Sequence, residues 1–467
     1  MTNPNSDLLN FIHIPAVEGA DTDTDKDKID NLFTQLDDRG VDNLVLYFHG
    51  GLTPRAVAES SAKLMFNKFG TATRHTISPI WETGGGETLQ SIISKHVDLP
   101  IVNRLIKWVR SKADTRQETE SAVLSPEVEN AESTESWLEP LSEAELDFIE
   151  AELVKEFQAD LDQDLDFQTE VSMASEETIQ NHFNELNNDI TLEMEPIDDS
   201  EGTLEFGALL DLPRLPFRLA GVTRRVIGRE RSGRGHGSKA TIIEELVREF
   251  SAGAVKSLWD DMKKRAQTMW HMPTRGEFKP AEYFLFKLAE LKKKKPDLAI
   301  DLIGHSAGSI VIAHFLAAAD FEHELTFRNV IFLAPAATMD LFHDEIVTYP
   351  QRFQRFRMFT MNDMREQEDN IEFNNIEIYN RSLLYFVAGV LETEVDQPLS
   401  GMHRYMTSQE PFNDYKLKRI NRFLNENDRL ALAGEPTGGG GETDATTHGG
   451  YYAEAKTLAT MADMFNA

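Results

Sequence analysis

The chain has 467 residues, of which 40% are hydrophobic, and its 79 acidic and 47 basic side chains give a net charge of −32. A surface of this sign repels phosphates, so the composition argues against a nucleic-acid-binding protein. The sequence contains no cysteine, which excludes disulfides and thiolate metal sites within it and fits a reducing compartment.

The first residues, MTNPNSDLLNFIHIP, have neither the basic start nor the long apolar core of a secretory signal. No apolar run reaches the length of about 18 residues that a membrane-spanning helix needs. We therefore expect a soluble, cytoplasmic protein without integral membrane association.

Two strand signals follow in the first part of the chain. DNLVLYFHGG, over residues 42–51, is apolar, rich in β-forming residues and ends in glycines, which predicts a buried strand and a turn. HTISPIWETGGG, over residues 75–86, predicts a second strand that leads into a loop.

The acidic charge is concentrated in residues 111–205, which hold 29 acidic and 3 basic side chains. Within this segment Leu146, Ile149, Leu153 and Phe157 recur at steps of three and four residues, which predicts a helix with one apolar face. The remainder of the segment is typical of loops or disordered chain. We expect an insertion that caps or decorates the main domain.

A basic stretch comes next: residues 206–240 hold eight Lys or Arg and two acidic side chains. We expect its arginines to pair with the preceding acidic segment. The alternative is a lid that contacts an anionic or lipidic surface peripherally. The apolar residues available to line such a lid are Phe206, Leu209, Leu210, Leu215, Phe217 and Leu219.

The rest of the chain alternates helical and strand patterns. Residues 239–270 and 280–295 are helical, and LAIDLIG, NVIFLAPA and RFRMFTMND are short strand-like runs. Such alternation predicts an α/β fold with a mostly parallel central sheet and helices on both faces. We expect residues 1–88 and 239–467 to form the core domain, and residues 89–238 to form a mainly helical or partly disordered insertion.

The motif GHSAG, at residues 304–308, places Ser306 between two glycines, after a strand-like run and before a helical one. A serine hydroxyl is a nucleophile only when it is exposed and has a base beside it, and a sharp strand-to-helix turn exposes it. Such a turn brings neighbouring main chain very close, which requires small residues at Gly304 and Gly308. The motif resembles the nucleophile elbow of the α/β-hydrolase superfamily, and the resemblance covers residues 10–88 and 239–467.

This resemblance implies an oxyanion hole made of main-chain N–H groups. One donor is the residue after the nucleophile, Ala307. The other comes from the early HGG sequence, where the resemblance leaves Gly51 and Leu52 as alternatives. We expect His49 to be structural, bonding to nearby loop main chain.

The resemblance also implies the chain order serine, acid, histidine. Asp363, just after the strand-like RMFTM, is the preferred acid. Glu366 and Asp369 are nearby competitors, and Asp340 is the choice if the acid follows the earlier strand.

For the base, His448 is preferred because it lies in a Gly- and Thr-rich loop before a last helical run. His403 is the alternative, and His305 is expected to pack. We predict no metal site and no cofactor.

The resulting hypothesis is a serine hydrolase that cleaves a carboxylic ester of a small molecule through an acyl-enzyme. A lipid ester and a thioester are further substrate candidates. The competing hypothesis is a non-catalytic scaffold whose acidic insertion binds a basic partner. Oligomeric state does not follow from the sequence.

Overall fold

The computed structural model describes residues 9–14, 25–81, 104, 106–113, 141–166, 212–271, 278–373, 376–434 and 443–467. The chain divides into two compact units. The sheet unit comprises Met1–Glu87, Asp260–Asp369 and Pro398–Ala467, and the helical unit comprises Thr88–Trp259 and Asn370–Gln397.

Seven parallel strands form the central sheet of the sheet unit in the described chain, in the order β1-β3-β2-β4-β5-β6-β9. Every neighbouring pair in this order is parallel, as the alternation of strands and helices predicted. The strands are β1 (Phe11–Ile14), β2 (Asn43–Phe48), β3 (Arg74–Trp81), β4 (Ala299–His305), β5 (Phe327–Leu333), β6 (Phe353–Met361) and β9 (Leu430–Ala433).

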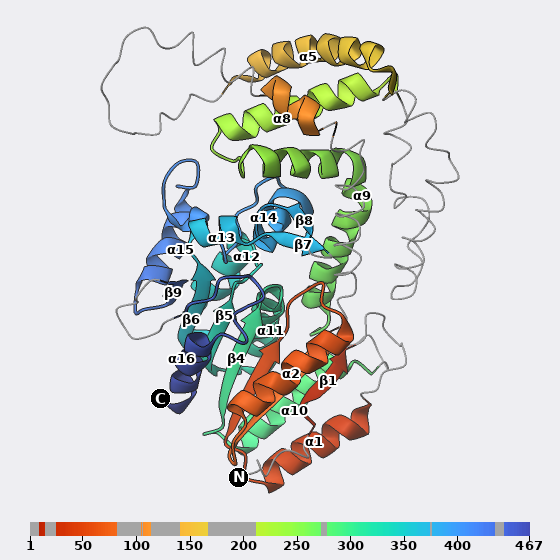
Figure 1. Ribbon diagram of the computed structural model, residues 1–467. Helices are drawn as coiled ribbons and strands as arrows, with labels where there is room; N and C mark the ends of the chain where they lie inside the picture. The colour runs from red at the N-terminus through yellow and green to blue at the C-terminus, as the bar shows by residue number, and fades with distance from the viewer. Residues whose placement is uncertain are drawn as a thin grey trace. The chain divides into compact units, whose positions relative to one another are not determined.

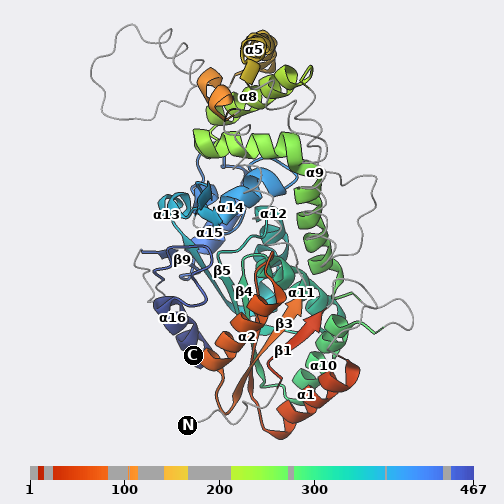
Figure 2. The same ribbon diagram turned by 45° about the vertical axis from the view of Figure 1, so that its right-hand side comes forward.

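Helices cover both faces of this sheet (Figures 1 and 2). The helices and short turns are α1 (Lys26–Asp38), α2 (Arg55–Phe69), α10 (Pro280–Lys294), α11 (Gly308–His323), α12 (Met339–Phe342), η2 (His343–Val347), η3 (Pro350–Arg352), α13 (Asp363–Glu368), η5 (His403–Met406), α15 (Tyr415–Asn425) and α16 (Ala455–Asn466). α2 and α16 share one apolar cluster with Tyr47 of β2, whereas Phe48 packs on Phe315 of α11. Because successive side chains of a strand point to opposite faces, α11 covers the face opposite to α2 and α16.

The strand order places a topological switch between β2 and β4. From β2 the chain passes through α2 to β3 on one side, and from β4 it passes through α11 to β5 on the other. In open α/β sheets, ligands bind outside the carboxyl ends of the strands where the order reverses in this way. The HGG sequence follows β2 and the serine motif ends β4, so both lie at this point.

The helical unit contains α5 (Glu143–Gln163), α8 (Leu215–Arg231), the first part of α9 (Ser238–Thr268), β7 (Ile371–Phe373), β8 (Ile376–Tyr379), α14 (Leu383–Phe386) and η4 (Val387–Leu391). The predicted apolar face of α5 is confirmed, because Leu146, Ile149, Leu153 and Phe157 are buried together with residues of α8. A capping box between Ser142 and Glu145 begins this helix.

The boundaries of the two units differ from the predicted ranges 1–88, 89–238 and 239–467. The helical unit continues to Trp259 and also includes Asn370–Gln397. The physical reason is that α9 runs through the predicted boundary, and Glu244 and Glu245 of this helix bind Arg229 of α8.

The basic stretch is part of this packing. Arg224 forms ion pairs with three carboxylates of α5, which confirms the expected pairing for that arginine, while Arg225 and Arg229 pair with α9 instead. Of the residues considered for a lid, Leu215 and Leu219 are buried in the core of the helical unit, so they do not line one. Phe217 is 60% exposed. Phe206, Leu209 and Leu210 lie outside the described residues.

Among the helices that the structure describes, none is long and apolar enough to cross a membrane.

Candidate active site

Ser306 lies at a sharp turn between β4 and α11. Its φ of 51° is in the left-handed region, which non-glycine residues rarely adopt and which is typical of a nucleophile elbow. The flanking glycines are required by close main-chain approach. A Cβ on Gly308 would lie 2.2 Å from the carbonyl oxygen of Phe48, and one on Gly304 would lie 2.9 Å from that of Gly308. The predicted reason for the two glycines is therefore confirmed.

Hydrogen bonds hold this turn in place. The N–H of Ser306 donates to the carbonyl of Leu333 at 2.9 Å, and the carbonyl of Ser306 accepts from the N–H of Ala336 at 3.1 Å. The hydroxyl of Ser309 also donates to that carbonyl, at 2.6 Å, and accepts from the N–H of Ala337. The loop after β5 thus fixes the strained main chain at the serine.

His49 has a structural role, as predicted. Its Nδ1 donates to the carbonyl of Gly50 at 2.8 Å, and its own carbonyl accepts from the indole N–H of Trp81. Burial lowers the pKa of His49 to about 4, so the ring is neutral at physiological pH.

The HGG sequence lies directly against the serine motif. A Cβ on Gly50 would lie 3.3 Å from the Cβ of Ser306, and one on Gly51 would lie 3.0 Å from that of Ala307. Leu52 has a φ of 55°. Ala307 is the N-cap residue of α11, where the positive end of the helix dipole lies. Of the residues predicted to supply the oxyanion donors, Ala307 and Gly51 are therefore neighbours in space, and Leu52 directly follows Gly51.

Both main-chain polar groups of His448, the N–H and the carbonyl, form hydrogen bonds to side chains. Its N–H donates to Oδ2 of Asp369 at 2.7 Å, and its carbonyl accepts from Nε2 of His305 at 2.9 Å. The ring centroids of His305 and His448 are 5.2 Å apart. Since His305 directly precedes Ser306, these contacts bring the predicted base to the serine turn.

The structure does not join the side chains of the predicted triad. Neither ring nitrogen of His448 has a hydrogen-bond partner among the described residues. Burial, and then the neighbouring His305, lower the pKa of His448 to about 3, so its imidazole is neutral at pH 7.

The four candidate acids lie in different surroundings. Asp363, at the first position of α13, accepts a hydrogen bond from Gln367 at 2.7 Å. Asp340 forms an ion pair with Lys416. Glu366 is fully buried. Of the four, Asp369 contacts His448, and burial raises its pKa to about 6 although the bond from His448 lowers it.

His403, the alternative base, lies in η5. The hydrogen bonds and ring contacts that place His448 come from His305 and Asp369, and His403 takes no part in them.

Two contacts that position His448 are not predicted by the sequence. His305 was expected only to pack, yet it binds the main chain of His448, and Asp369 was a secondary acid candidate. Both bonds join residues far apart in the chain, so no local pattern points to them.

Within the described ranges, no group of three or more His, Asp or Glu side chains is arranged to hold a metal ion.

A comparison with known proteins finds a family whose model matches part of the chain. The model of the family described as "Alpha/beta hydrolase of unknown function" matches residues 282–366, which contain the serine turn and end before Asp369 and His448. No curated protein and no solved structure matches the chain. The parallel sheet, the strained serine turn and this match over residues 282–366 show that the chain has an α/β-hydrolase fold.

Proposed function

We propose that the protein is a serine hydrolase that cleaves a carboxylic ester through an acyl-enzyme. The observation that carries this proposal is the left-handed turn at Ser306, at the switch point of the sheet and beside the HGG main chain. A strained turn of this kind presents a hydroxyl at the carboxyl edge of the sheet.

In the proposed first step, neutral His448 accepts the proton of Ser306 while the oxygen of Ser306 attacks the acyl carbon of the ester. The N–H groups of Ala307 and of Gly51 or Leu52 stabilise the negative oxygen of the tetrahedral intermediate. His448 then returns the proton to the leaving alcohol, and water releases the acyl group in the same manner. Hydrogen bonds between such groups often tighten only when substrate is bound.

For the acid we propose Asp369 in place of Asp363, which the sequence favoured. The contact between Asp369 and His448 supports this choice, and Asp363 bonds to Gln367 instead. In this role Asp369 orients the imidazole and stabilises its charged form.

A fluorophosphonate probe tests the nucleophile. We expect the wild-type protein and the control variant Ser61→Ala, on α2, to be labelled, and Ser306→Ala to remain unlabelled. A series of p-nitrophenyl esters of increasing acyl length then separates short-ester from lipid-ester preference, and an acyl thioester tests the third substrate class.

The acid and base are tested by matched pairs of variants. We expect Asp369→Asn and His448→Gln to lower kcat/KM by a factor on the order of 10² to 10⁴, because both would belong to one proton-transfer unit. Asp363→Asn and His403→Gln should stay within a few-fold of wild type. The opposite pattern would return the roles to Asp363 and His403.

One observation favours a second candidate function, a non-catalytic scaffold: the ring nitrogens of His448 are unbonded among the described residues. In that case the wild-type protein would remain unlabelled, and the acidic segment would bind a basic partner. Labelling that depends on Ser306 excludes this candidate.

A further inference from the structure

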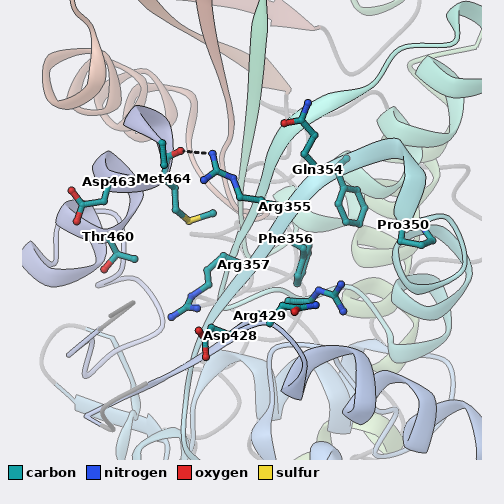
Figure 3. A pocket seen from close by; sticks show the side chains of 13 residues that line it. Pro350, Gln354, Arg355, Phe356, Arg357, Asp428, Arg429, Thr460, Asp463 and Met464 are labelled. Carbon is teal, nitrogen blue, oxygen red and sulfur yellow. Dashed lines mark hydrogen bonds between the residues drawn. The ribbon is translucent and has the colours of Figure 1, made fainter. Parts of the chain in front are cut away.

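We propose that a cavity at the amino edge of the sheet binds a small organic oxyanion, at a site separate from Ser306. The cavity, of about 440 Å³, lies between the first half of β6, the turn before β9 and the last turns of α16 (Figure 3). Ser306 follows the carboxyl end of β4, and all of these strands are parallel. The cavity therefore lies at the amino ends of the strands, and Ser306 lies at their carboxyl ends.

Three arginines line this cavity: Arg355, Arg357 and Arg429. Arg355 and Arg357 are two residues apart on β6, so they project from the same face of the strand. Figure 3 shows Arg357 extending toward Asp428 and Arg355 hydrogen-bonded to the main chain of Met464. The guanidinium groups thus come from β6 and, for Arg429, from the turn just before β9.

The charge of Arg355 and Arg429 is only partly neutralised. Arg355 donates to the carbonyl of Met464 at 2.9 Å and has no carboxylate within ion-pair distance in the described part of the chain. Arg429 donates to the carbonyl of Phe423 and lies 3.8 Å from Glu426. Burial lowers the pKa of Arg357 and of Arg429, although an acidic neighbour of each raises it.

The acidic groups at the cavity do not cancel this charge. Asp428 and Asp463 also line it, but both are exposed, whereas Arg357 is only 6% exposed. Water screens an exposed carboxylate more than a buried guanidinium. An anion that enters the cavity therefore meets guanidinium groups that water screens less than it screens the neighbouring carboxylates.

The edge of β6 offers main-chain donors in addition. The N–H of Met358 donates to the carbonyl of Arg429, at 2.7 Å, and β9 pairs with β6 only from Met358 onward. Main-chain groups two residues apart point to the same side of a strand. The N–H of Phe356 therefore points to the same side as that of Met358, where the cavity lies and where β9 does not extend to pair with it.

These features define the ligand class. Guanidinium groups bind carboxylate and phosphate oxygens in fork-like pairs, and a main-chain N–H adds a further donor. Phe353, Phe356 and Met464 supply apolar wall beside the charges. The site therefore fits an anionic group carried on a small apolar body, either a phosphate monoester or a carboxylate.

Isothermal titration of the full chain with phenyl phosphate and with benzoate, at constant ionic strength, tests the proposal. We expect at least one of the two to bind, and phenol, which has the same ring without the anion, not to bind. Arg355→Gln should weaken the affinity about tenfold, because a charge-assisted hydrogen bond is lost. Arg419→Gln, on α15 and outside the lining of the cavity, is the matched control and should bind as wild type does.

Arg357→Gln should weaken binding similarly. Arg357 is buried, so the affinity of this variant is interpreted only if its circular dichroism and melting temperature match those of wild type. If they do not, the result for Arg355→Gln decides, because Arg355 is partly exposed. Absence of binding by both anions at millimolar concentration, or an unchanged affinity in Arg355→Gln, would overturn the proposal. The stronger of the two anions identifies phosphate or carboxylate as the preferred group.

Discussion

At the scale of single residues, the serine turn depends on main chain packed against main chain. Gly308 lies against the carbonyl oxygens of Phe48 and His49, which belong to the end of β2 and the loop after it. These atoms cannot rotate away as a side chain could. The identity of one glycine therefore fixes how closely α11 approaches β2, and with it the position of Ser306.

We predict that Gly308→Ala destabilises the protein by about 1–3 kcal/mol, the usual range for overpacking, and abolishes labelling of Ser306. The reason is the 2.2 Å separation between the added Cβ and the carbonyl oxygen of Phe48. Urea denaturation measures the change. Gly228→Ala is the control in another helix, because its Cβ would meet Leu146 at an ordinary 3.7 Å. If Gly308→Ala were as stable as wild type, the close approach would not determine the turn.

His448 should also make stability depend on pH. Its pKa falls from 6.5 in the unfolded chain to about 3 in the folded one, so between these values the unfolded chain binds the additional proton. Stability from this residue is therefore complete above about pH 6.5 and decreases as the pH falls. Between pH 7 and pH 5 the loss is about 2 kcal/mol.

Urea denaturation of wild type and His448→Gln at pH 7 and pH 5 checks this prediction. The variant should lose about 2 kcal/mol less than wild type over this interval, because glutamine does not titrate. Asp369 has the opposite sign, since its raised pKa favours the protonated folded state between about pH 4 and pH 6, and its contribution is present in both proteins. Equal losses in the two proteins would contradict a buried, neutral His448.

At the scale of elements, short-range sequence patterns were sufficient to predict the strands and the turn at Ser306. The apolar runs that became β2, β5 and β6, the glycines at residues 304 and 308, and the apolar face of α5 are all local signals. The assignment of Asn370–Gln397 to the helical unit was not predictable in this way. Nor was the bond from His305 to His448, because periodicity records neighbours along the chain and not contacts between distant segments.

The apolar face of α5 provides a prediction for this element. Leu153 is fully buried against α8, whereas Phe148 on the same helix is 66% exposed. Leu153→Ala should destabilise the helical unit by about 2–5 kcal/mol, through lost burial and the cavity left behind. Phe148→Ala should change stability by less than about 0.5 kcal/mol. Hydrogen exchange of the α5 and α8 amides distinguishes the two; similar exchange in both variants would show that α5 is not packed through this face.

At the scale of the whole molecule, each unit is built from segments that are not contiguous in the chain. In the helical unit a buried charged network joins them. Arg229 of α8 binds Glu244 at 2.5 Å and Glu245 at 3.0 Å, and His236 bridges Glu244 and Asp396, each at 2.8 Å. Asp396 belongs to the later segment, so the network ties that segment to α8 and α9.

Removing Arg229, the arginine of this network, should therefore destabilise both chain segments of the helical unit together. Burial alone would raise the pKa of Glu244, but His236 and Arg229 lower it to about 2, so the carboxylate stays charged at neutral pH. Arg229→Met leaves this buried charge short of one partner, and we expect a loss of about 3–5 kcal/mol. Arg224→Met removes an arginine whose partners Glu143, Asp147 and Glu150 are 82%, 70% and 38% exposed, and should cost less than about 1 kcal/mol.

Hydrogen exchange followed by peptide resolves where the loosening occurs. In Arg229→Met, the amides of α8, of α9 up to Trp259 and of residues 376–397 should all exchange faster, because one network holds all three. In Arg224→Met, faster exchange should be confined to α5 and the facing turn of α8. Faster exchange confined to α8 in Arg229→Met, with residues 376–397 protected as in wild type, would show that the later segment is held by its apolar contacts and not by the charged network.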